Sequence, residues 1–209
     1  MDLISIKVEF MSIDTLISTK LKTLRKRQNL TLDALAERSG ISRSMISLIE
    51  REQSSPTATV LNKLADALGT SLPELLSDSS EETISEAQCV SSIENQKTWQ
   101  DPESGYIRRQ LTPRNATSTV ELTEIIFPPQ KSVTFENMLR NIEIHQQVWI
   151  LSGEIEISDD DSTWCLKEGD CLAFQQKEHT TFFNPNNTEA RYLIALTSFL
   201  LPRRTNNGI

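Results

Sequence analysis

The sequence predicts two unlike parts, an all-helical segment followed by an all-β segment. Residues 13–76 carry apolar residues at helical spacing, with a capping residue before most runs. From residue 99 onward, short runs rich in β-branched and aromatic residues alternate with turn clusters. The intervening stretch SDSSEETISEAQCVSSIENQKT is rich in Ser and Glu. We therefore expect a multi-domain α + all-β protein with an N-terminal extension (1–12), a helical domain (13–76), a linker (77–98) and a β-barrel (99–209).

Composition limits the classes of protein that this chain can belong to. Of its 209 residues 37% are hydrophobic, and no run approaches the roughly 18 apolar residues of a membrane-spanning helix. The N-terminus lacks the apolar core of a secretory signal. The cysteines Cys89, Cys165 and Cys171 are odd in number and form no CxxC pair. We expect a cytoplasmic protein with free thiols and no membrane partner.

Charge is distributed unevenly along the chain. The net charge is −8, which by itself disfavours nucleic-acid binding. Residues 13–76, however, contain nine Lys and Arg against seven Asp and Glu, whereas residues 77–209 contain eleven against twenty. Contacts with nucleic acid are therefore expected only from the helical domain.

Five helices are expected in residues 13–76. The first runs from Ile13 to about Gln28, and Asp14 is a candidate N-cap. Thr31 caps a second helix over 32–38, which Gly40 ends in the left-handed conformation. The third covers 42–51 behind the cap Ser42, the fourth begins at Pro56 or Thr57 and stops at Gly69, and the fifth follows the cap Ser71. For the linker, the alternative is a surface helix around 81–89.

The stretch LDALAERSGISRSMISLIE, residues 32–50, has the pattern of two short helices that cross steeply. A small residue, Ala36, stands where the helices approach, and Gly40 allows a tight turn between them. Apolar residues on both sides of the turn can be buried, namely Leu35, Ile41, Ile46 and Ile49. The alternative is an ordinary pair of amphipathic helices in a bundle. The joint pattern favours a helix-turn-helix whose second helix enters a major groove.

Residues 17–76 resemble the lambda-repressor/Cro-type (XRE) helix-turn-helix family. The resemblance lies in LKTLRKRQNLTLDALAERSGISRSMISLIEREQSSPTATVLNKLADALGTSLPELL. It implies a compact five-helix domain that binds double-stranded operator DNA as a dimer. In similar domains the arginine of "LR" pairs with the glutamate of "IE". That implies a structural ion pair between Arg25 and Glu50, which we favour over a DNA contact by Arg25.

The resemblance makes 42–51 the recognition helix, with its exposed N-terminal residues at base edges. An arginine such as Arg43 can bind guanine through two hydrogen bonds. The second helix should bind a phosphate through its N-terminal amides. For Thr31 and Thr57 the alternative is a purely capping role, and for the others it is solvation. The candidate DNA contacts are Thr31, Leu32, Ser42, Arg43, Ser44, Ser47, Gln53, Ser54 and Thr57.

The β segment predicts an antiparallel sandwich or barrel. Its β-rich runs are GYIRRQL, STVELTEIIF, QVWILSGEIEIS, STWCL, TTFFN and ARYLIALT. Two stretches, QQVWILSGEIEIS and LKEGDCLAFQQKEHTTFFNP, resemble the paired-strand motifs of cupins, which are small jelly-roll β-barrels. The combination of a helix-turn-helix and a cupin resembles a familiar arrangement of bacterial regulators.

When the sequence is aligned with the cupin motifs through Gly153, the metal ligands of metal-binding cupins are absent from their usual positions. Counting back from Gly153 places Gln146 at the position of the family's glutamate, and residues 139–141 at its paired histidines. Thr180 stands at the histidine of the second motif, while His145 and His179 are each displaced by one residue and should face the other side of a strand. The sequence therefore predicts no metal and no cofactor, although a shifted register would allow both histidines to join a cysteine in a metal site.

The barrel interior is then a candidate pocket for a small-molecule effector. Strand alternation directs inward the side chains of Gln146, Val148, Ile150, Thr180, Phe182 and Asn184. This lining is mostly apolar with a few polar groups, as small-molecule sites are. The alternative is a barrel filled by its own side chains and used for dimerisation.

We expect a homodimeric transcriptional regulator, acting as a repressor, whose barrel senses a small molecule and dimerises. No Ser/His/Asp arrangement or paired-carboxylate motif points to catalysis, so we expect no enzymatic activity. The competing function is a cupin isomerase or oxygenase joined to a helix-turn-helix.

Overall fold

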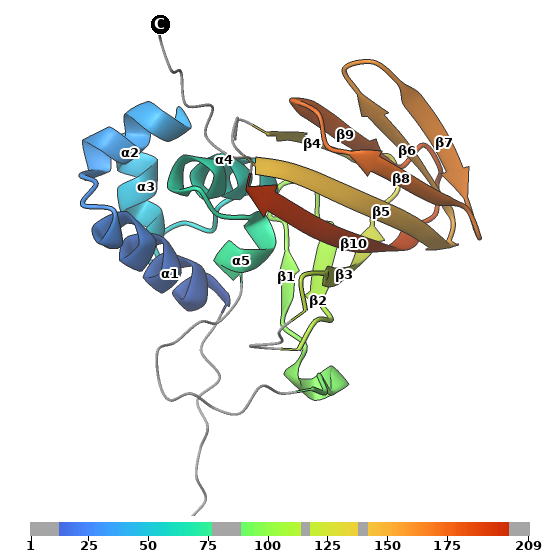
Figure 1. Cartoon of the computed structure of the whole chain (residues 1–209), viewed down its shortest axis with the longest axis horizontal. Helices are drawn as coiled ribbons and strands as arrows, with labels where there is room; N and C mark the ends of the chain where they lie inside the picture. Colours follow the sequence, from blue (N-terminus) through green and yellow to red (C-terminus); the bar gives the residue numbers. More distant parts are fainter. Residues whose placement is uncertain (1–12, 77–88, 114–117, 138–141, 201–209) are drawn as a thin grey trace, which may run out of the picture.

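The computed structural model describes residues 13–76, 89–113, 118–137 and 142–200 (Figure 1). These residues form five α-helices, then a 3-10 helix and ten strands, which confirms the predicted order of a helical domain and an all-β domain. The proposed extension 1–12 and most of the alternative helix at 81–89 lie outside the described residues. Within the described residues, no helix is both long and apolar enough to cross a bilayer.

Four of the five helices, α2 to α5, begin after the capping residues that the sequence indicates. The first helix is the exception, because it already includes Ile13 and Asp14, so Asp14 lies in its first turn and is not its N-cap. The Thr31 hydroxyl accepts from Ala34 N at 3.1 Å, and the Ser42 hydroxyl accepts from Met45 N at 3.2 Å. Gly40 closes the second helix at φ +67°. The helices are α1 (Ile13–Arg27), α2 (Leu32–Ser39), α3 (Arg43–Ile49), α4 (Ala58–Leu68) and α5 (Leu72–Leu76).

The third helix is shorter than predicted. It ends at Ile49, and Glu50 is its C-cap, whereas the sequence predicts a helix to about Arg51. Glu52 adopts φ +59°, a left-handed conformation in which the Glu52 amide donates to Ile49 O at 3.0 Å. The Glu52 side chain then accepts hydrogen bonds from α1, including one from Thr15 Oγ1 at 2.7 Å. This turn therefore fixes the end of α3 against α1.

The C-terminal domain consists of two facing antiparallel sheets in the jelly-roll manner expected of a cupin, and Figure 1 shows their strands packed face to face. The six-stranded sheet has the order β1-β2-β3-β10-β5-β8, and the four-stranded sheet has the order β4-β9-β6-β7. After the 3-10 helix Ile93–Asn95, the strands are β1 (Thr98–Gln100), β2 (Ile107–Gln110), β3 (Glu121–Phe127), β4 (Ser132–Glu136), β5 (Ile142–Ser152), β6 (Glu154–Asp159), β7 (Thr163–Lys167), β8 (Cys171–Gln175), β9 (His179–Phe183) and β10 (Ala190–Leu200).

Aromatic side chains fill much of the space between the sheets. Tyr106 packs on Phe127 with ring centroids 5.7 Å apart, and Phe182 stacks on Tyr192 at 6.2 Å. Val148, Ile150, Ile155 and Ile157 complete the apolar interior. Three strands, β1, β4 and β8, are missing from the β-rich runs identified in the sequence, although β8 lies in one of the stretches that resemble cupins. β1 has only three residues, and in β4 only one of the five side chains is buried, so their hydrophobic signals are weak.

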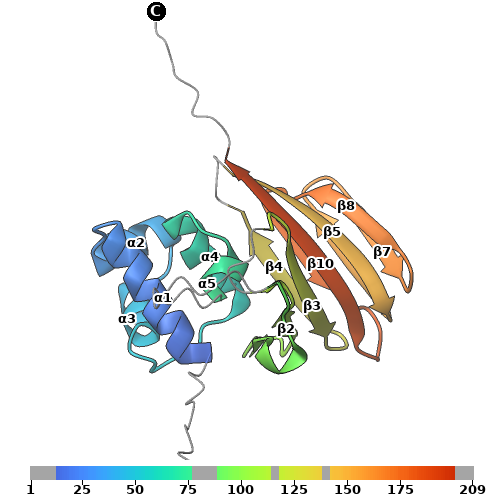
Figure 2. The same cartoon turned by 60° about the horizontal axis from the view of Figure 1, so that its bottom comes forward.

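The helical domain is docked on the barrel through α4 (Figures 1 and 2). Asp101 Oδ1 accepts from Ala58 N at 2.7 Å, so a barrel carboxylate caps the N-terminus of α4. Farther along α4, Thr59 Oγ1 donates to Thr134 O and Asn62 Nδ2 donates to Glu136 O, both on β4. The two figures show α4 and α5 between the strands and the helix pair α2–α3. The barrel therefore contacts the part of the domain behind the helix-turn-helix.

Replacing Gly153 by alanine should destabilise the barrel more than replacing Gly169. Both glycines have positive φ, +76° and +89°, which costs about 1–2 kcal/mol for other residues. A Cβ at Gly153 would also lie 2.9 Å from Glu189 O and 3.0 Å from Ala190 Cα, whereas one at Gly169 meets open space. We expect Gly153→Ala to lower the free energy of unfolding by about 3 kcal/mol and Gly169→Ala by about 1–2 kcal/mol.

Urea titration followed by tryptophan fluorescence measures both variants, because all three tryptophans lie in the barrel. Equal losses in the two variants would contradict a steric role for the close approach at Gly153.

Candidate nucleic-acid interface and barrel cavity

The first turn of α3 presents a polar surface to solvent. Ser42, Arg43 and Ser44 are exposed, while Ile46 and Ile49 on the opposite side are fully buried. Ser47 is half-buried, one turn farther along the helix. The helix therefore has the two faces that a recognition helix needs, one packed in the domain and one free for base edges.

Arg43 is held by an acidic residue of the preceding helix. Arg43 Nε lies 3.1 Å from Asp33 Oδ1, and the two side chains are 64% and 75% exposed. An ion pair this exposed contributes only about 0–1 kcal/mol. A DNA base or phosphate can therefore displace Asp33 at little cost.

The remaining candidates divide into capping and surface residues. Thr31 and Thr57 both cap helices through their hydroxyls, as the capping alternative predicted, and Thr31 is exposed as well. Gln53 is exposed, and Leu32 is half-buried. Ser54 is half-buried, and its hydroxyl lies 3.8 Å from Met45 Sδ. These residues flank α3 in sequence at the start of α2 and in the loop before α4.

Arg25 and Glu50 form the structural ion pair that the family resemblance implies. Arg25 Nε and Nη2 donate to the two carboxylate oxygens of Glu50 at 2.6 and 2.8 Å, and Nη1 donates to Leu30 O at 2.9 Å. Their side chains are 12% and 7% exposed. The hydrogen bond to Glu50 raises the pKa of Arg25. Arg25 therefore ties α1 to the C-terminus of α3 and is not available to DNA.

A cavity of about 270 Å³ lies between the sheets, and the helical domain forms part of its wall. From the helical side it is lined by α4, the α4–α5 turn and α5, at Asn62, Asp66, Gly69, Thr70, Ser71, Leu72 and Glu74. From the barrel it is lined chiefly by aromatic and aliphatic side chains, with Tyr106, Arg108, Glu121, Gln146, Gln176 and Ser198 as polar members. Its size and lining are those of a site for a small molecule.

The predicted pocket residues are all buried, but most of them do not line this cavity. Gln146 and Phe182 do line it. Val148, Ile150 and Thr180 are inward-facing and fully buried yet contribute to the packed part of the barrel, and the cavity wall does not include them. Asn184 is a structural residue, because its Nδ2 donates to Phe127 O and Thr188 O. The cavity lies nearer the helical domain than the sequence indicated.

The polar residues that the sequence analysis missed lie on β2 and β3. Tyr106 immediately precedes β2, Arg108 lies within it, and both side chains are buried. Glu121 begins β3 and also lines the cavity. The alternation in GYIRRQL places the tyrosine and the first arginine on one face, which is the signal that could have identified them.

Burial shifts the pKa values of these cavity groups. It raises the pKa of the Tyr106 hydroxyl, which is therefore neutral at physiological pH. Burial also raises the pKa of Glu121, and the nearby Glu74 carboxylate adds to this effect while Arg108 opposes it. The pKa of Arg108 is lowered by burial, but a guanidinium stays protonated in proteins. The cavity thus contains a desolvated cation.

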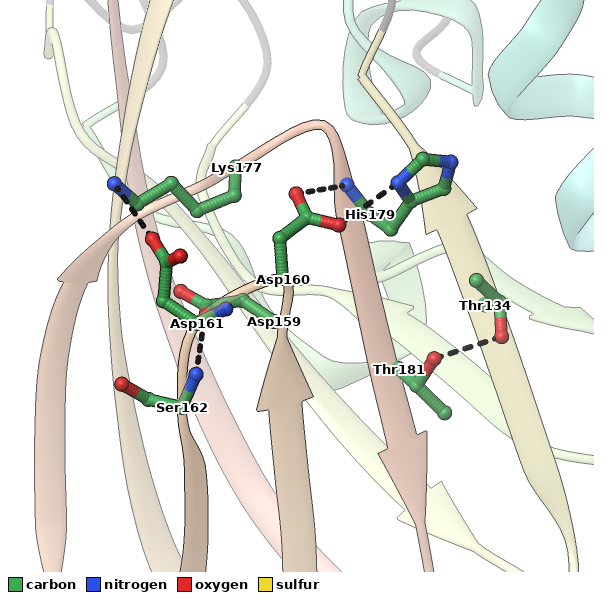
Figure 3. A network of polar contacts seen from close by, with 8 residues as sticks. All are labelled: Thr134, Asp159, Asp160, Asp161, Ser162, Lys177, His179 and Thr181. Atoms are coloured by element: carbon green, nitrogen blue, oxygen red, sulfur yellow. Dashed lines mark hydrogen bonds and ion pairs between the residues drawn. The ribbon is translucent and has the colours of Figure 1, made fainter.

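The residues present do not fit the metal site that the cupin resemblance implies. Gln146 and Thr180 occupy the motif positions inside the barrel, while His145 and His179 are 48% and 54% exposed on its outside. Figure 3 shows His179 beside Asp160, with Nδ1 2.9 Å from Asp160 Oδ1. That contact lowers the pKa of Asp160. Within the described residues, no three His, Cys, Asp or Glu side chains are placed to bind one ion.

The helical domain is similar in sequence to known helix-turn-helix proteins. A family model described as helix-turn-helix (HTH_3) matches residues 21–75. The chain is 46% identical over 52 residues to the HTH-type transcriptional regulator SutR of Escherichia coli, a match that covers 25% of this chain and 29% of that protein. It is 39% identical over 67 residues to the control protein C.SmaI of Serratia marcescens, covering 32% of this chain and 80% of that protein.

One solved structure is similar over nearly the whole chain. It is an HTH_3 family transcriptional regulator from Vibrio cholerae, with 23% identity and a TM-score of 0.68. The alignment covers 91% of this chain and 98% of that one. This likeness shows that the two chains share the arrangement of a helical domain and a β domain.

Neutralising Glu50 should destabilise the helical domain. Glu50→Gln leaves the half-buried guanidinium of Arg25 without its charge partner, and we expect a loss of about 2–3 kcal/mol. Thermal unfolding followed by helical circular dichroism measures the loss. Glu37→Gln, an exposed change of the same chemistry on α2, is the matched control. If Glu50→Gln and Glu37→Gln have the same Tm, the ion pair has no stabilising role.

Proposed function

Since this chain belongs to the helix-turn-helix family of transcriptional regulators, we propose that it binds operator DNA as a homodimer and that a small molecule in the barrel controls this binding. The observation that supports the proposal most directly is the cavity whose wall belongs to both domains. An occupant of that cavity contacts the DNA-binding domain itself. We expect the protein to act as a repressor in the cytoplasm, where its three exposed cysteines, which form no disulfide, stay reduced.

The surface proposed to read DNA is the first turn of α3. Arg43 and Ser44 reach base edges, while Ser42 and Ser47 supply further hydrogen bonds. Thr31 and Leu32 at the start of α2 bind one phosphate through main-chain amides. Gln53, Ser54 and Thr57 bind phosphates on the other side of the helix. The balance of nine basic to seven acidic residues in the domain gives modest affinity for a single copy, so two copies are needed for tight binding.

The surface proposed for dimerisation is the outer face of the six-stranded sheet. Leu122, Trp149 and Phe199 are large apolar side chains that are 40%, 49% and 53% exposed there. The register joins them through β10, where Leu122 pairs with Ala195 and Trp149 pairs with Leu193. Beside Phe199 the same face also carries the partly exposed Glu143 and His145. The outer face of the four-stranded sheet carries polar exposed residues, including Ser132, Glu154, Thr163, Lys167 and His179. A second copy on the apolar face would bury this patch in an isologous contact.

Enzymatic activity is not part of the proposal. The cupin motif positions that would hold metal are occupied by Gln146 and Thr180, and neither side chain provides the imidazole or carboxylate ligands of a catalytic metal.

Replacing Arg43 and Ser44 by alanine should weaken operator binding. The double variant removes the guanidinium and a hydroxyl from the recognition turn, and we expect a loss of about 10–100-fold in affinity. The operator is first selected from random duplex DNA by the wild-type protein, and fluorescence anisotropy then gives Kd. Lys167→Ala removes one positive charge on the barrel and should leave Kd unchanged. Unchanged binding by the double variant would rule out α3 as the reading surface.

Replacing Trp149 by glutamate should convert the dimer to a monomer. The charge would be buried without a partner in the proposed interface, whereas in the monomer it remains half-exposed. Sedimentation equilibrium should give twice 23.7 kDa for the wild type and 23.7 kDa for Trp149→Glu. Thr163→Glu on the polar face should remain dimeric. A wild type that sediments as a monomer, or a Trp149→Glu variant that stays dimeric, contradicts this interface.

A further inference from the structure

Arg108 is a buried cation with no hydrogen bond at Nε. Its residue is 7% exposed, and Nη2 donates to Thr123 Oγ1 at 2.9 Å. Nearby, Arg109 and Arg191 both pair with Glu124 on the outer side of the sheet, so that carboxylate neutralises other charges. Inside the cavity Glu121 is the carboxylate that acts on this cation, but burial raises the pKa of Glu121 and its Oε2 has no hydrogen-bond partner. Burying a guanidinium that is not paired with a carboxylate through hydrogen bonds costs several kcal/mol, and proteins accept this cost at sites where a ligand supplies the partner.

The unpartnered polar atoms of the described residues are concentrated at the cavity. Among the described residues, six buried side-chain oxygen and nitrogen atoms lack a hydrogen-bond partner, and five of these atoms belong to residues that line the cavity. They are Thr70 Oγ1, Tyr106 Oη, Arg108 Nε, Glu121 Oε2 and Gln146 Oε1. Buried polar groups are otherwise almost always paired, so this concentration marks the position of a polar ligand group.

The unpartnered groups favour an acceptor of hydrogen bonds over a donor. Arg108 can only donate, and Tyr106, whose pKa is raised by burial, keeps its hydroxyl proton. Burial raises the pKa of Glu121 as well, which favours its protonated, donating form. Gln146 Oε1 is a carbonyl oxygen and can only accept, and the amide nitrogen of the same side chain already donates to Gln176 Oε1 at 3.0 Å. A ligand oxyanion satisfies most of these atoms and neutralises the guanidinium at once.

We propose that the effector is a small organic anion, a carboxylate or phosphate-type oxyanion, whose charged group binds Arg108 and Tyr106 inside the barrel. The inference rests on the effector role proposed above and specifies its chemistry. The apolar part of the effector lies among Ile125, Phe127, Phe182 and Tyr192, which line the same cavity. A volume of about 270 Å³ restricts the effector to a small metabolite.

The helical wall of the cavity has the opposite charge. Asp66 on α4 and the exposed Glu74 on α5 both line it. An anionic group is therefore repelled from this wall and directed toward Arg108, while the neutral part of the effector faces the α4–α5 turn at Thr70. The competing possibility, an amine bound by Asp66, Glu74 and Glu121, has to be separated experimentally.

The first experiment removes the cation without any ligand. Arg108→Met keeps a long apolar side chain and removes the desolvated charge, so the ligand-free variant should melt at the same temperature as the wild type or higher. Arg191→Gln, which removes a half-exposed cation outside the cavity, is the matched control. A marked fall in Tm for Arg108→Met alone would show that Arg108 is a structural residue and would overturn the proposal.

The second experiment measures ligand chemistry by thermal shift on the full chain at constant ionic strength. The probes are matched sets on one skeleton: benzoate, phenylphosphonate, benzamide and benzylamine, and hexanoate, hexanamide and hexylamine, followed by a library of metabolite acids, amides and amines. We expect acids alone to raise Tm, by about 5–10 °C at a hundredfold excess over Kd. Arg108→Met should lose at least about 30-fold in affinity for them, and Arg191→Gln should not.

The outcomes distinguish this proposal from the proposed function. If amides or amines stabilise as strongly as acids, or if Arg108→Met responds like the wild type, the anion assignment is wrong but the effector role stands. If no compound of any class stabilises the protein, both the anion assignment and the effector role fail. Operator binding remains a separate measurement, because it depends on Arg43 and Ser44 on α3.

Discussion

The docking of α4 on the barrel is the constraint on which the rest of the structure depends. Asp101, 2% exposed, accepts from Ala58 N at the start of α4, and its second oxygen accepts from both the amide and the hydroxyl of Ser104. A carboxylate at a helix N-terminus is stabilised by the free amides and the helix dipole, so burial here is compensated. The barrel therefore shares the capping of α4 with Thr57, whose hydroxyl accepts from Val60 N, and this shared N-terminus fixes the DNA-binding domain to the β domain.

The two ends of α4 have different contacts with the β domain. The N-terminal end is fixed to Asp101 and to β4, whereas the C-terminal end and the turn after it form the cavity wall. Helix α4 also packs against α2, the first helix of the helix-turn-helix. A small displacement of the α4–α5 turn therefore reaches α2 through packed side chains. In the dimer that we propose, two recognition helices must match the spacing of two half-sites, so we expect such a displacement to alter operator affinity.

The sequence predicted the helical domain closely because its signals are local. Thr31, Ser42 and Gly40 have capping chemistry that a single chain segment reveals, and each does what the pattern indicates. The cavity could not be predicted in the same way. Alternation identified Gln146 and Phe182 as inward-facing, but which inward residues meet empty space depends on the packing of both sheets and on the docked α4–α5 turn. Arg108 was missed because an arginine in a strand is ordinarily exposed.

The buried charge of Arg108 supports our proposal that the barrel binds an effector and does not only stabilise the fold. A barrel serving stability alone would fill this space with apolar side chains, because a buried cation that is not paired through hydrogen bonds destabilises the fold. The chain instead keeps the Nε of a guanidinium, a tyrosine hydroxyl and a glutamine carbonyl without hydrogen-bond partners around one cavity. An anion that binds there removes the desolvation penalty and thereby stabilises the arrangement in which the α4–α5 turn closes the cavity. In the function that we propose, the free energy gained when an anion pairs with Arg108 is the source of the coupling between the effector and operator binding.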